Sequence, residues 1–136
     1  HWTGSHWYNE TNGDNPLSVR FYEAYVAHTG DDQPMGWAGE AQAGVAAYAA
    51  AIEAAGSTET RSVIEALKGA TIRTVTGERL IRAEDNQAVK DVELMYIEPD
   101  GSAPRGYRVS ETIRIDGASV IEPPSPGEPL DLKTRA

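Results

Sequence analysis

Apolar side chains recur every three or four positions in the first half of the chain, a spacing typical of helices. The first helix is predicted to begin at Asn15-Pro16, because Asn15 can cap the free N–H groups and Pro16 suits the first helical position. It is predicted to end at Gly30. Its apolar stripe consists of Leu17, Phe21 and Tyr25.

Two further helices are predicted before residue 70. The second runs from Trp37 to Ala55 and stops at Gly56, and the third begins after a cap at Ser57 or Thr58. The inward positions of the second are predicted to be Ala41, Val45, Tyr48 and Ile52. Those of the third are predicted to be Val63, Ile64 and Leu67, with Gly69 closing the helix. The many Ala and Gly residues of the second helix indicate close packing and a central position.

In the second half of the chain, apolar side chains recur at every second position, which predicts strands. The expected strands are 2–8 at the start, two short strands in 71–83 around Thr76-Gly77, and then 89–97 and 106–115. Turns are expected at Pro99-Asp100-Gly101 and Asp116-Gly117. The proline-rich run 122–129 is expected to be extended.

Charge and composition narrow the class of partner. The chain has 136 residues, a net charge of −9 and only 12 Lys and Arg residues, which are scattered. Binding to nucleic acid or to an anionic membrane surface is therefore not expected. The longest apolar stretch, 43–52, is too short for a membrane span, so none is predicted.

Catalytic and metal chemistry find little support in the sequence. The absence of cysteine excludes disulfides and thiolate chemistry. His1, His6 and His28 match no metal-ligand spacing, and no nucleotide-binding or nucleophile motif is present. We predict no enzyme activity, no metal and no cofactor.

The order of the patterns resembles a known family. A strand precedes the Asn-Pro-capped helix, and the runs "EAAGSTETRSVIEALKGATIRTVTGERLIRAEDNQAV" and "GYRVSETIRIDGASVIEPP" follow. Together they resemble the C-terminal portion of type I periplasmic binding proteins, in the branch that serves ABC importers of branched-chain amino acids, amides and urea. The resemblance implies an α/β fold with two lobes, three chain crossings between them and a solute in the cleft.

The resemblance also implies a division of the chain. Residues 1–90 would end the N-terminal lobe, 91–97 would be a hinge crossing, and 98–121 would return to the C-terminal lobe, with 122–136 as a Pro-rich tail. The hinge itself is expected at Asp91 to Met95. By position in the family pattern, the expected solute contacts are Trp7, Tyr8, Trp37, Glu40 and Gln42. The family often has Tyr where Gln42 stands, and packing roles for the aromatic residues remain open.

The resemblance implies the solute-binding component of an ABC transporter, periplasmic or extracellular, that takes an amino acid, amide or similar small polar molecule. Its partners would be that solute and the ABC permease. A ligand-sensing receptor module of the same fold is the alternative, and a small enzyme is a third. The chain starts without Met and without a leader, so we expect a processed or truncated chain. Because a fragment would leave apolar faces uncovered, we expect the rest of the protein, a second copy or a rearranged sheet to cover them.

Overall fold

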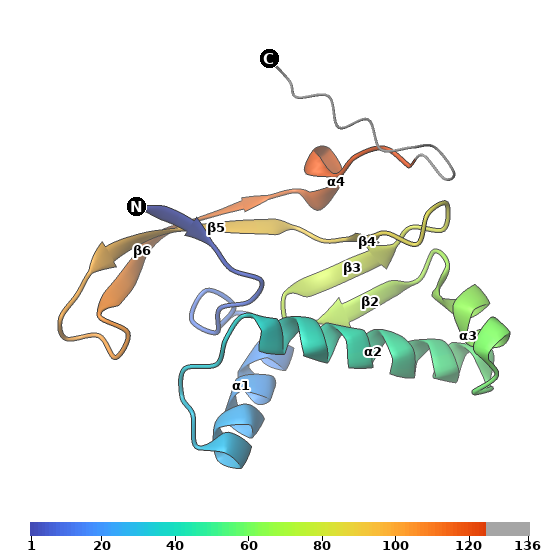
Figure 1. Ribbon diagram of the computed structural model, residues 1–136, viewed down its shortest axis with the longest axis horizontal. Helices are drawn as coiled ribbons and strands as arrows, with labels where there is room; N and C mark the ends of the chain where they lie inside the picture. Colours follow the sequence, from blue (N-terminus) through green and yellow to red (C-terminus); the bar gives the residue numbers. More distant parts are fainter. Residues whose placement is uncertain (125–136) are drawn as a thin grey trace.

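The chain forms two layers, which the computed structural model describes for residues 1–124 (Figure 1). Most of the predicted Pro-rich tail, residues 125–136, lies outside the described residues. The upper layer is an antiparallel sheet in the order β1-β5-β6. Its strands are β1 (Trp2–Gly4), β5 (Val92–Pro99) and β6 (Tyr107–Ile115), followed by the short helix α4 (Gly117–Val120).

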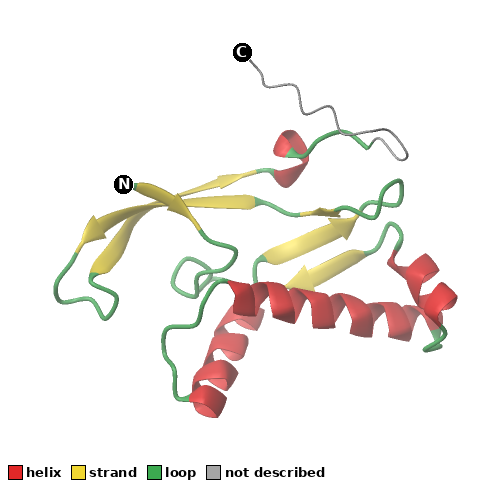
Figure 2. Cartoon of the chain, viewed as in Figure 1, coloured by secondary structure: helices red, strands yellow, loops and turns green. Residues whose placement is uncertain are grey.

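The lower layer contains the sheet β2-β3-β4 and the longer helices (Figure 2). Helix α2 runs along this sheet and contacts β2 and α3. The strands are β2 (Thr71–Thr74), β3 (Gly77–Ile81) and β4 (Ala88–Val89). The helices are α1 (Pro16–Thr29), α2 (Trp37–Ala55) and α3 (Thr60–Leu67). The expected α/β fold class is confirmed.

Local capping explains the helix boundaries. Asn15 Oδ1 accepts a hydrogen bond from Leu17 N at 3.0 Å, and Pro16 stands at the first helical position, as predicted. Gly30 and Gly56 follow α1 and α2 in the left-handed conformation, at φ 72° and 60°. The predicted cap of α3 is wrong, because the Glu59 carboxylate, and not Ser57 or Thr58, accepts from Ser62 N.

Most of the apolar stripe predicted for α2 faces solvent, although Ile52 is half-buried. Val45 and Tyr48 are 72% and 57% exposed, and Ile64 on the neighbouring α3 is also exposed. The buried positions of α2 are instead the small ones, Gly39, Ala43 and Ala51. Small side chains let α2 lie close to the sheet β2-β3-β4 and to Trp7. The inward face of the helix is therefore decided by which distant segments pack against it, and not by which of its own side chains are largest.

The long strand predicted over 89–97 is two strands. β4 pairs with β3, whereas β5 pairs with β1 and β6, so the chain changes sheets at Lys90-Asp91. Gly117 sits against this point, since a Cβ there would overlap the Lys90 carbonyl. The predicted turn at Asp116-Gly117 is in fact the start of α4, which Asp116 caps.

Strand β1 is shorter than the predicted 2–8. After Gly4 the chain turns inward, and the Ser5 hydroxyl donates to Trp7 O at 2.9 Å. This turn buries the Trp7 indole between the two layers, where its Nε1 donates to the Ser18 hydroxyl at 2.9 Å. The segment from Ser5 to Asn15 and the segment Lys90-Asp91 therefore both join the layers, and they line one cavity together.

Candidate functional site

A cluster of charged groups lies where α2 begins. Glu40, in the first turn of α2, binds Arg79 of β3 through two hydrogen bonds, Nη1 to Oε2 at 2.6 Å and Nη2 to Oε1 at 3.0 Å. Lys90 Nζ donates to Glu40 Oε1 at 2.6 Å. The cluster therefore ties the helix to β3 and to the segment that passes between the sheets.

These contacts fix the charge of Glu40. Partial burial alone raises the pKa of its carboxyl, but the hydrogen bonds and positive charges of Arg79 and Lys90 outweigh burial and lower the pKa to about 2. Glu40 is thus a carboxylate at any physiological pH. Asp91 and Glu93 line the neighbouring cavity together with Lys90 and Arg114, so acidic and basic side chains are balanced around it.

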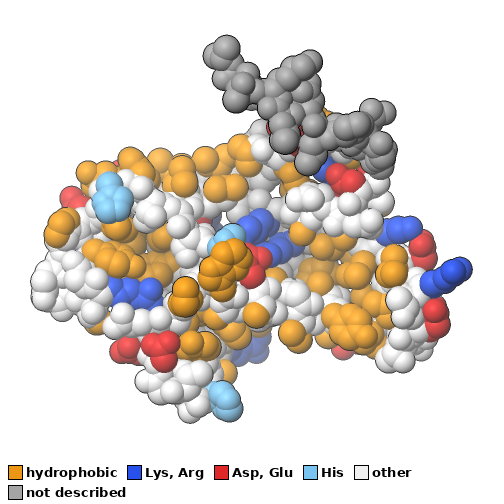
Figure 3. Space-filling model, in the orientation of Figure 1, with side chains coloured by type: hydrophobic (Ala, Val, Ile, Leu, Met, Phe, Trp, Pro, Cys, Tyr) orange, Lys and Arg blue, Asp and Glu red, His pale blue; other side chains and the backbone are white. Residues whose placement is uncertain are grey.

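An aromatic pair borders the cluster. The rings of His6 and Trp37 lie with their centroids 4.0 Å apart, and His6 Nδ1 is 3.5 Å from Glu40 Oε1. Trp37 is 61% exposed, which is unusual for so large an apolar side chain. In the space-filling view, a histidine, hydrophobic atoms and both signs of charge gather near the centre of the visible face (Figure 3).

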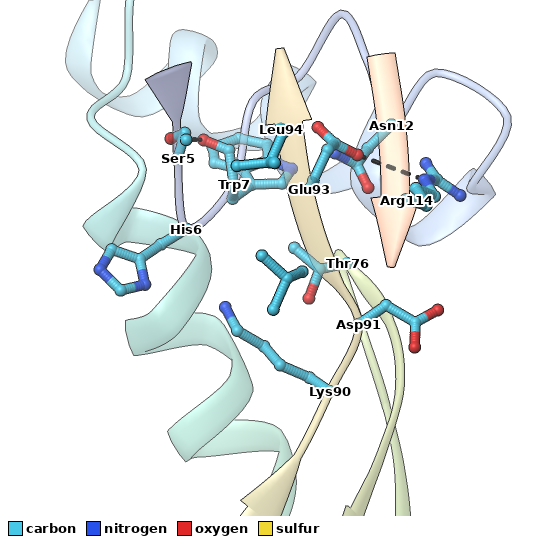
Figure 4. Close-up of a pocket in the computed structure, with 12 residues that line it drawn as sticks. Ser5, His6, Trp7, Asn12, Thr76, Lys90, Asp91, Glu93, Leu94 and Arg114 are labelled. Carbon is cyan, nitrogen blue, oxygen red and sulfur yellow. Dashed lines mark hydrogen bonds and ion pairs between the residues drawn. The ribbon is translucent and has the colours of Figure 1, made fainter. Parts of the chain in front are cut away.

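His6 and Lys90 also line a cavity of about 310 Å³ between the two layers (Figure 4). The opposite part of its lining includes Glu93 and Arg114, which bind each other at 3.2 Å. Trp7 and Leu94 add apolar surface. A volume of this size is at the lower end of the range for small-molecule pockets.

The structure places exposed Trp37 and half-buried Glu40 beside His6 and buries two other predicted residues. Trp7 is only 2% exposed, and its ring meets the Phe21 ring edge-on at 5.2 Å. Tyr8 is also buried, and the Arg105 guanidinium lies 5.1 Å from its ring centroid. Burial, and then the neighbouring Glu10, raises the pKa of the Tyr8 phenol.

Gln42 faces inward and supports the sheet. Its Oε1 accepts a hydrogen bond from Val75 N at 3.2 Å, in the turn between β2 and β3. Sequence reasoning missed His6, Arg79 and Lys90 as partners of Glu40. Alternation placed Arg79 within a strand, but no local signal pairs a strand residue with a helix start 39 positions earlier.

Within residues 1–124, no group of three or more acidic or histidine side chains is arranged to hold a metal ion. No helix among these residues is both long and apolar enough to cross a membrane.

Comparison with known proteins identifies a family. The family profile described as "Periplasmic binding protein" matches residues 1–102, three quarters of the chain. No curated protein matches the chain.

Several solved structures share the fold. A branched-chain amino acid ABC transporter protein from Rhodopseudomonas palustris is 18% identical, with a TM-score of 0.79 over 90% of this chain and 32% of its own. An amino acid ABC transporter substrate-binding protein from Pseudomonas fluorescens is 25% identical, with a TM-score of 0.69 over 84% of this chain and 31% of its own.

A third structure was solved with a ligand. It is an ABC transporter solute-binding protein from Rhodopseudomonas palustris in complex with p-hydroxybenzoic acid, 22% identical, with a TM-score of 0.62 over 85% of this chain and 31% of its own. The chain thus spans about a third of the length of each of these structures.

Proposed function

Because the chain belongs to the periplasmic binding protein family, we propose that it forms part of the solute-binding component of an ABC transporter. The type I resemblance seen in the sequence is confirmed by the family match and by the structural neighbours. The protein would bind a small polar solute, an amino acid, amide or similar molecule, between two lobes and present it to a permease in the periplasm. No chemical step is part of this function.

The change of sheets near residue 90 supports a hinged arrangement. The β3-β4 ladder ends at Val89 and the β5-β6 ladder begins at Val92, close to the proposed boundary between residues 1–90 and the crossing at 91–97. A short segment between two separately hydrogen-bonded sheets is the kind of place where a hinge absorbs backbone rotation. We therefore place the hinge at the start of the crossing, and 98–121 in the returning lobe.

The solute is proposed to contact the exposed end of α2. Trp37 offers an open aromatic surface, and Glu40 fixes the cations Arg79 and Lys90 beside it. The other three predicted residues would support this surface from behind. Trp7 and Tyr8 are buried in packing contacts, and Gln42 accepts a hydrogen bond from the β2–β3 turn. This arrangement is the observation that carries the proposal: an open aromatic and charged site at a helix start, beside the crossing point.

The exposed apolar positions of α2 and α3 support a larger protein. Val45, Tyr48 and Ile64 lie on the surface, although such side chains favour burial. The structures that match are about three times as long as this chain. We propose that the remaining part of the same lobe covers these positions, and a second copy of the chain is the alternative occupant.

The transporter role is favoured over a sensor module because the three matched structures described above are all components of transporters. The proposal is tested on a longer polypeptide, which contains this chain together with the rest of both proposed lobes. A thermal-shift screen measures its unfolding midpoint with amino acids, amides and hydroxybenzoic acids. Binding at a concentration 100-fold above Kd should add about 2.7 kcal/mol of stability and raise the midpoint. A screen in which no small polar solute shifts the midpoint would contradict it.

A further inference from the structure

We propose that Arg114 and Glu93 form an ionic clasp that holds the two layers at one angle across the hinge, so that movement of the lobes has to break it. This role rests on the proposed function, because it takes the hinge at Lys90-Asp91 as given. Hydrogen bonds that divide the residues around the hinge between the two layers support it.

The peptide bond between Lys90 and Asp91 marks the boundary between the layers. Lys90 Nζ donates to Glu40 in α2, which fastens Lys90 to the lower layer. Asp91 Oδ1 accepts a hydrogen bond at 3.1 Å from Gly117 N, which follows β6 in the upper layer. Two consecutive residues are therefore anchored to different layers, and rotation between the layers is concentrated at this point.

The loop before α1 belongs to the lower layer. At its start, Trp7 Nε1 donates to the Ser18 hydroxyl of α1 at 2.9 Å. At its end, Asn15 Nδ2 donates to Thr74 O of β2 at 3.0 Å. Both ends of the loop are thus fixed to elements of the lower layer, so the intervening residues 8–14 move with that layer.

Arg114 and Glu93 reach from the upper sheet to this loop (Figure 4). They are partners in the β5–β6 ladder, and Arg114 Nε donates to Glu93 Oε2 at 3.2 Å. Arg114 Nη2 also donates to Thr11 O at 3.0 Å and lies 3.7 Å from Asp14 Oδ1. The Thr11 hydroxyl donates to Glu93 Oε1. One ion pair of the upper layer is therefore bound to a loop that is fixed in the lower layer.

The clasp is partly shielded from water. The Glu93 side chain is 14% exposed and that of Arg114 is 46% exposed, so salt screens this pair less than an ion pair on the open surface. Arg114 has a carboxylate on each side, Glu93 in its own layer and Asp14 in the loop. Lys90 and Asp91, which line the same cavity, balance each other in charge. The guanidinium is therefore attracted to both layers.

Rotation at the hinge would separate the partners of the clasp. Glu93 stands two residues beyond Asp91, and two strand residues span about 7 Å. A rotation of about 30° transverse to the strand therefore moves Glu93 by roughly 3–4 Å relative to Thr11, which exceeds the reach of a hydrogen bond. A solute that favours another angle between the lobes must supply the free energy that breaks these contacts.

Other contacts between the layers come from more yielding parts of the chain. Arg105, in the loop between β5 and β6, donates to Pro34 O at 3.4 Å. Arg82 Nη1 donates to Glu122 O, beyond α4, at 2.9 Å. Each is a single hydrogen bond to a backbone carbonyl outside the strands, where the chain can follow a rotation. The clasp is carried by two paired strands and by a loop fixed at both ends, so it resists rotation more strongly.

Distances between two spin labels test the clasp on the longer polypeptide without solute. The labels are attached at Ala54→Cys in α2 and Glu111→Cys in β6, which are exposed positions of the two layers, and any other cysteine is replaced by serine. Pulsed electron paramagnetic resonance then measures the distribution of label distances. We expect one main distance when the clasp is intact. Arg114→Gln and Thr11→Val should each raise the population at other distances by at least about threefold.

The matched control is Arg108→Gln, because Arg108 pairs with Glu98 inside the upper sheet and should leave the distances unchanged. Thermal unfolding checks that each variant is folded. A measurement without variants gives the same readout, since about 1 M NaCl shortens the screening length to about 3 Å and should raise the same population in the wild type.

Unchanged distance distributions in the folded variants and in high salt would overturn the clasp and leave the proposed function intact. A change of equal size in Arg108→Gln would also overturn it, because any lost ion pair would then have the same effect. Since no solute is needed, a screen without any bound solute would overturn the proposed function and leave the clasp in place.

Discussion

The guanidinium of Arg79 holds the carboxylate of Glu40 through two parallel hydrogen bonds, of 2.6 and 3.0 Å, across 39 residues of sequence. Arg79 is nearly buried, whereas Glu40 also reaches Lys90 and the surface. The pair thus joins the interior of the lower layer to the site at the start of α2. Removing this pair should lower the stability of the fold and also weaken the binding of solute.

Arg79→Met should lower the free energy of unfolding by about 2–3 kcal/mol, because it leaves Glu40 with Lys90 as its remaining strong partner. Urea unfolding followed by tryptophan fluorescence measures this loss. The control is Arg73→Met, since the Arg73 side chain is 88% exposed and lies 3.9 Å from Glu78. That change should stay within about 0.5 kcal/mol, and equal losses in the two variants would contradict the buried role of Arg79.

Glu40 should also make stability depend on pH. Its folded pKa is about 2 against an ordinary 4.5, so the unfolded state binds more protons between these values. The contribution of Glu40 is therefore complete above pH 4.5 and is lost as pH falls toward 2. Glu40→Gln should show a smaller loss of unfolding free energy between pH 5 and pH 3 than the wild type. Other acids titrate in both proteins, so the comparison isolates Glu40, and identical pH slopes would argue against it.

The close approach of α2 to Trp7 gives a prediction about glycine. A Cβ at Gly39 would overlap the Trp7 side chain, so Gly39→Ala should lower the free energy of unfolding by about 1–3 kcal/mol. Gly44 lies in the same helix with nothing within 4 Å of such a Cβ. Gly44→Ala should therefore stabilise the protein by about 0.5–1 kcal/mol. Thermal unfolding of both variants tests this prediction. The changes in the free energy of unfolding must have opposite signs in the two variants.

The exposed positions of α2 give a prediction about whether the rest of the lobe packs against this helix. In isolated residues 1–136, Val45→Glu and Tyr48→Lys should each change the free energy of unfolding by less than about 0.5 kcal/mol, since both side chains are exposed. In the longer polypeptide each should cost about 2 kcal/mol or more, because a charge would then be buried against the rest of the lobe. Denaturant unfolding of both proteins measures the difference. Equal small effects in both would show that this face is not covered.

The helix boundaries could be predicted from the sequence because capping is local. Asn15, Gly30 and Gly56 act within one turn of the helix ends, and the structure confirms all three. The inward face of α2 could not be predicted from its own residues. Gly39 and Ala43 are buried because distant segments approach them, and the larger Val45 and Tyr48 are left outside.

The site was only partly visible in the sequence for a similar reason. Trp37 and Glu40 stand in the first turn of a predictable helix, so their position could be stated. The partners of Glu40 come from β3 and from Lys90, which is 50 residues away, and only the pairing of β3 with β2 and β4 brings them to α2. The ionic contacts of Glu40 therefore appear only in the fold.

Isothermal titration of two proteins tests the central claim most directly: residues 1–136 alone, and the longer polypeptide that carries the rest of both lobes. The titrant is the solute that raises the midpoint of the longer polypeptide most in the thermal-shift screen. We predict saturable one-to-one binding by the longer polypeptide and none by residues 1–136, because the two-lobed cleft needs surfaces from both lobes. Binding of comparable affinity by residues 1–136 alone would contradict the account.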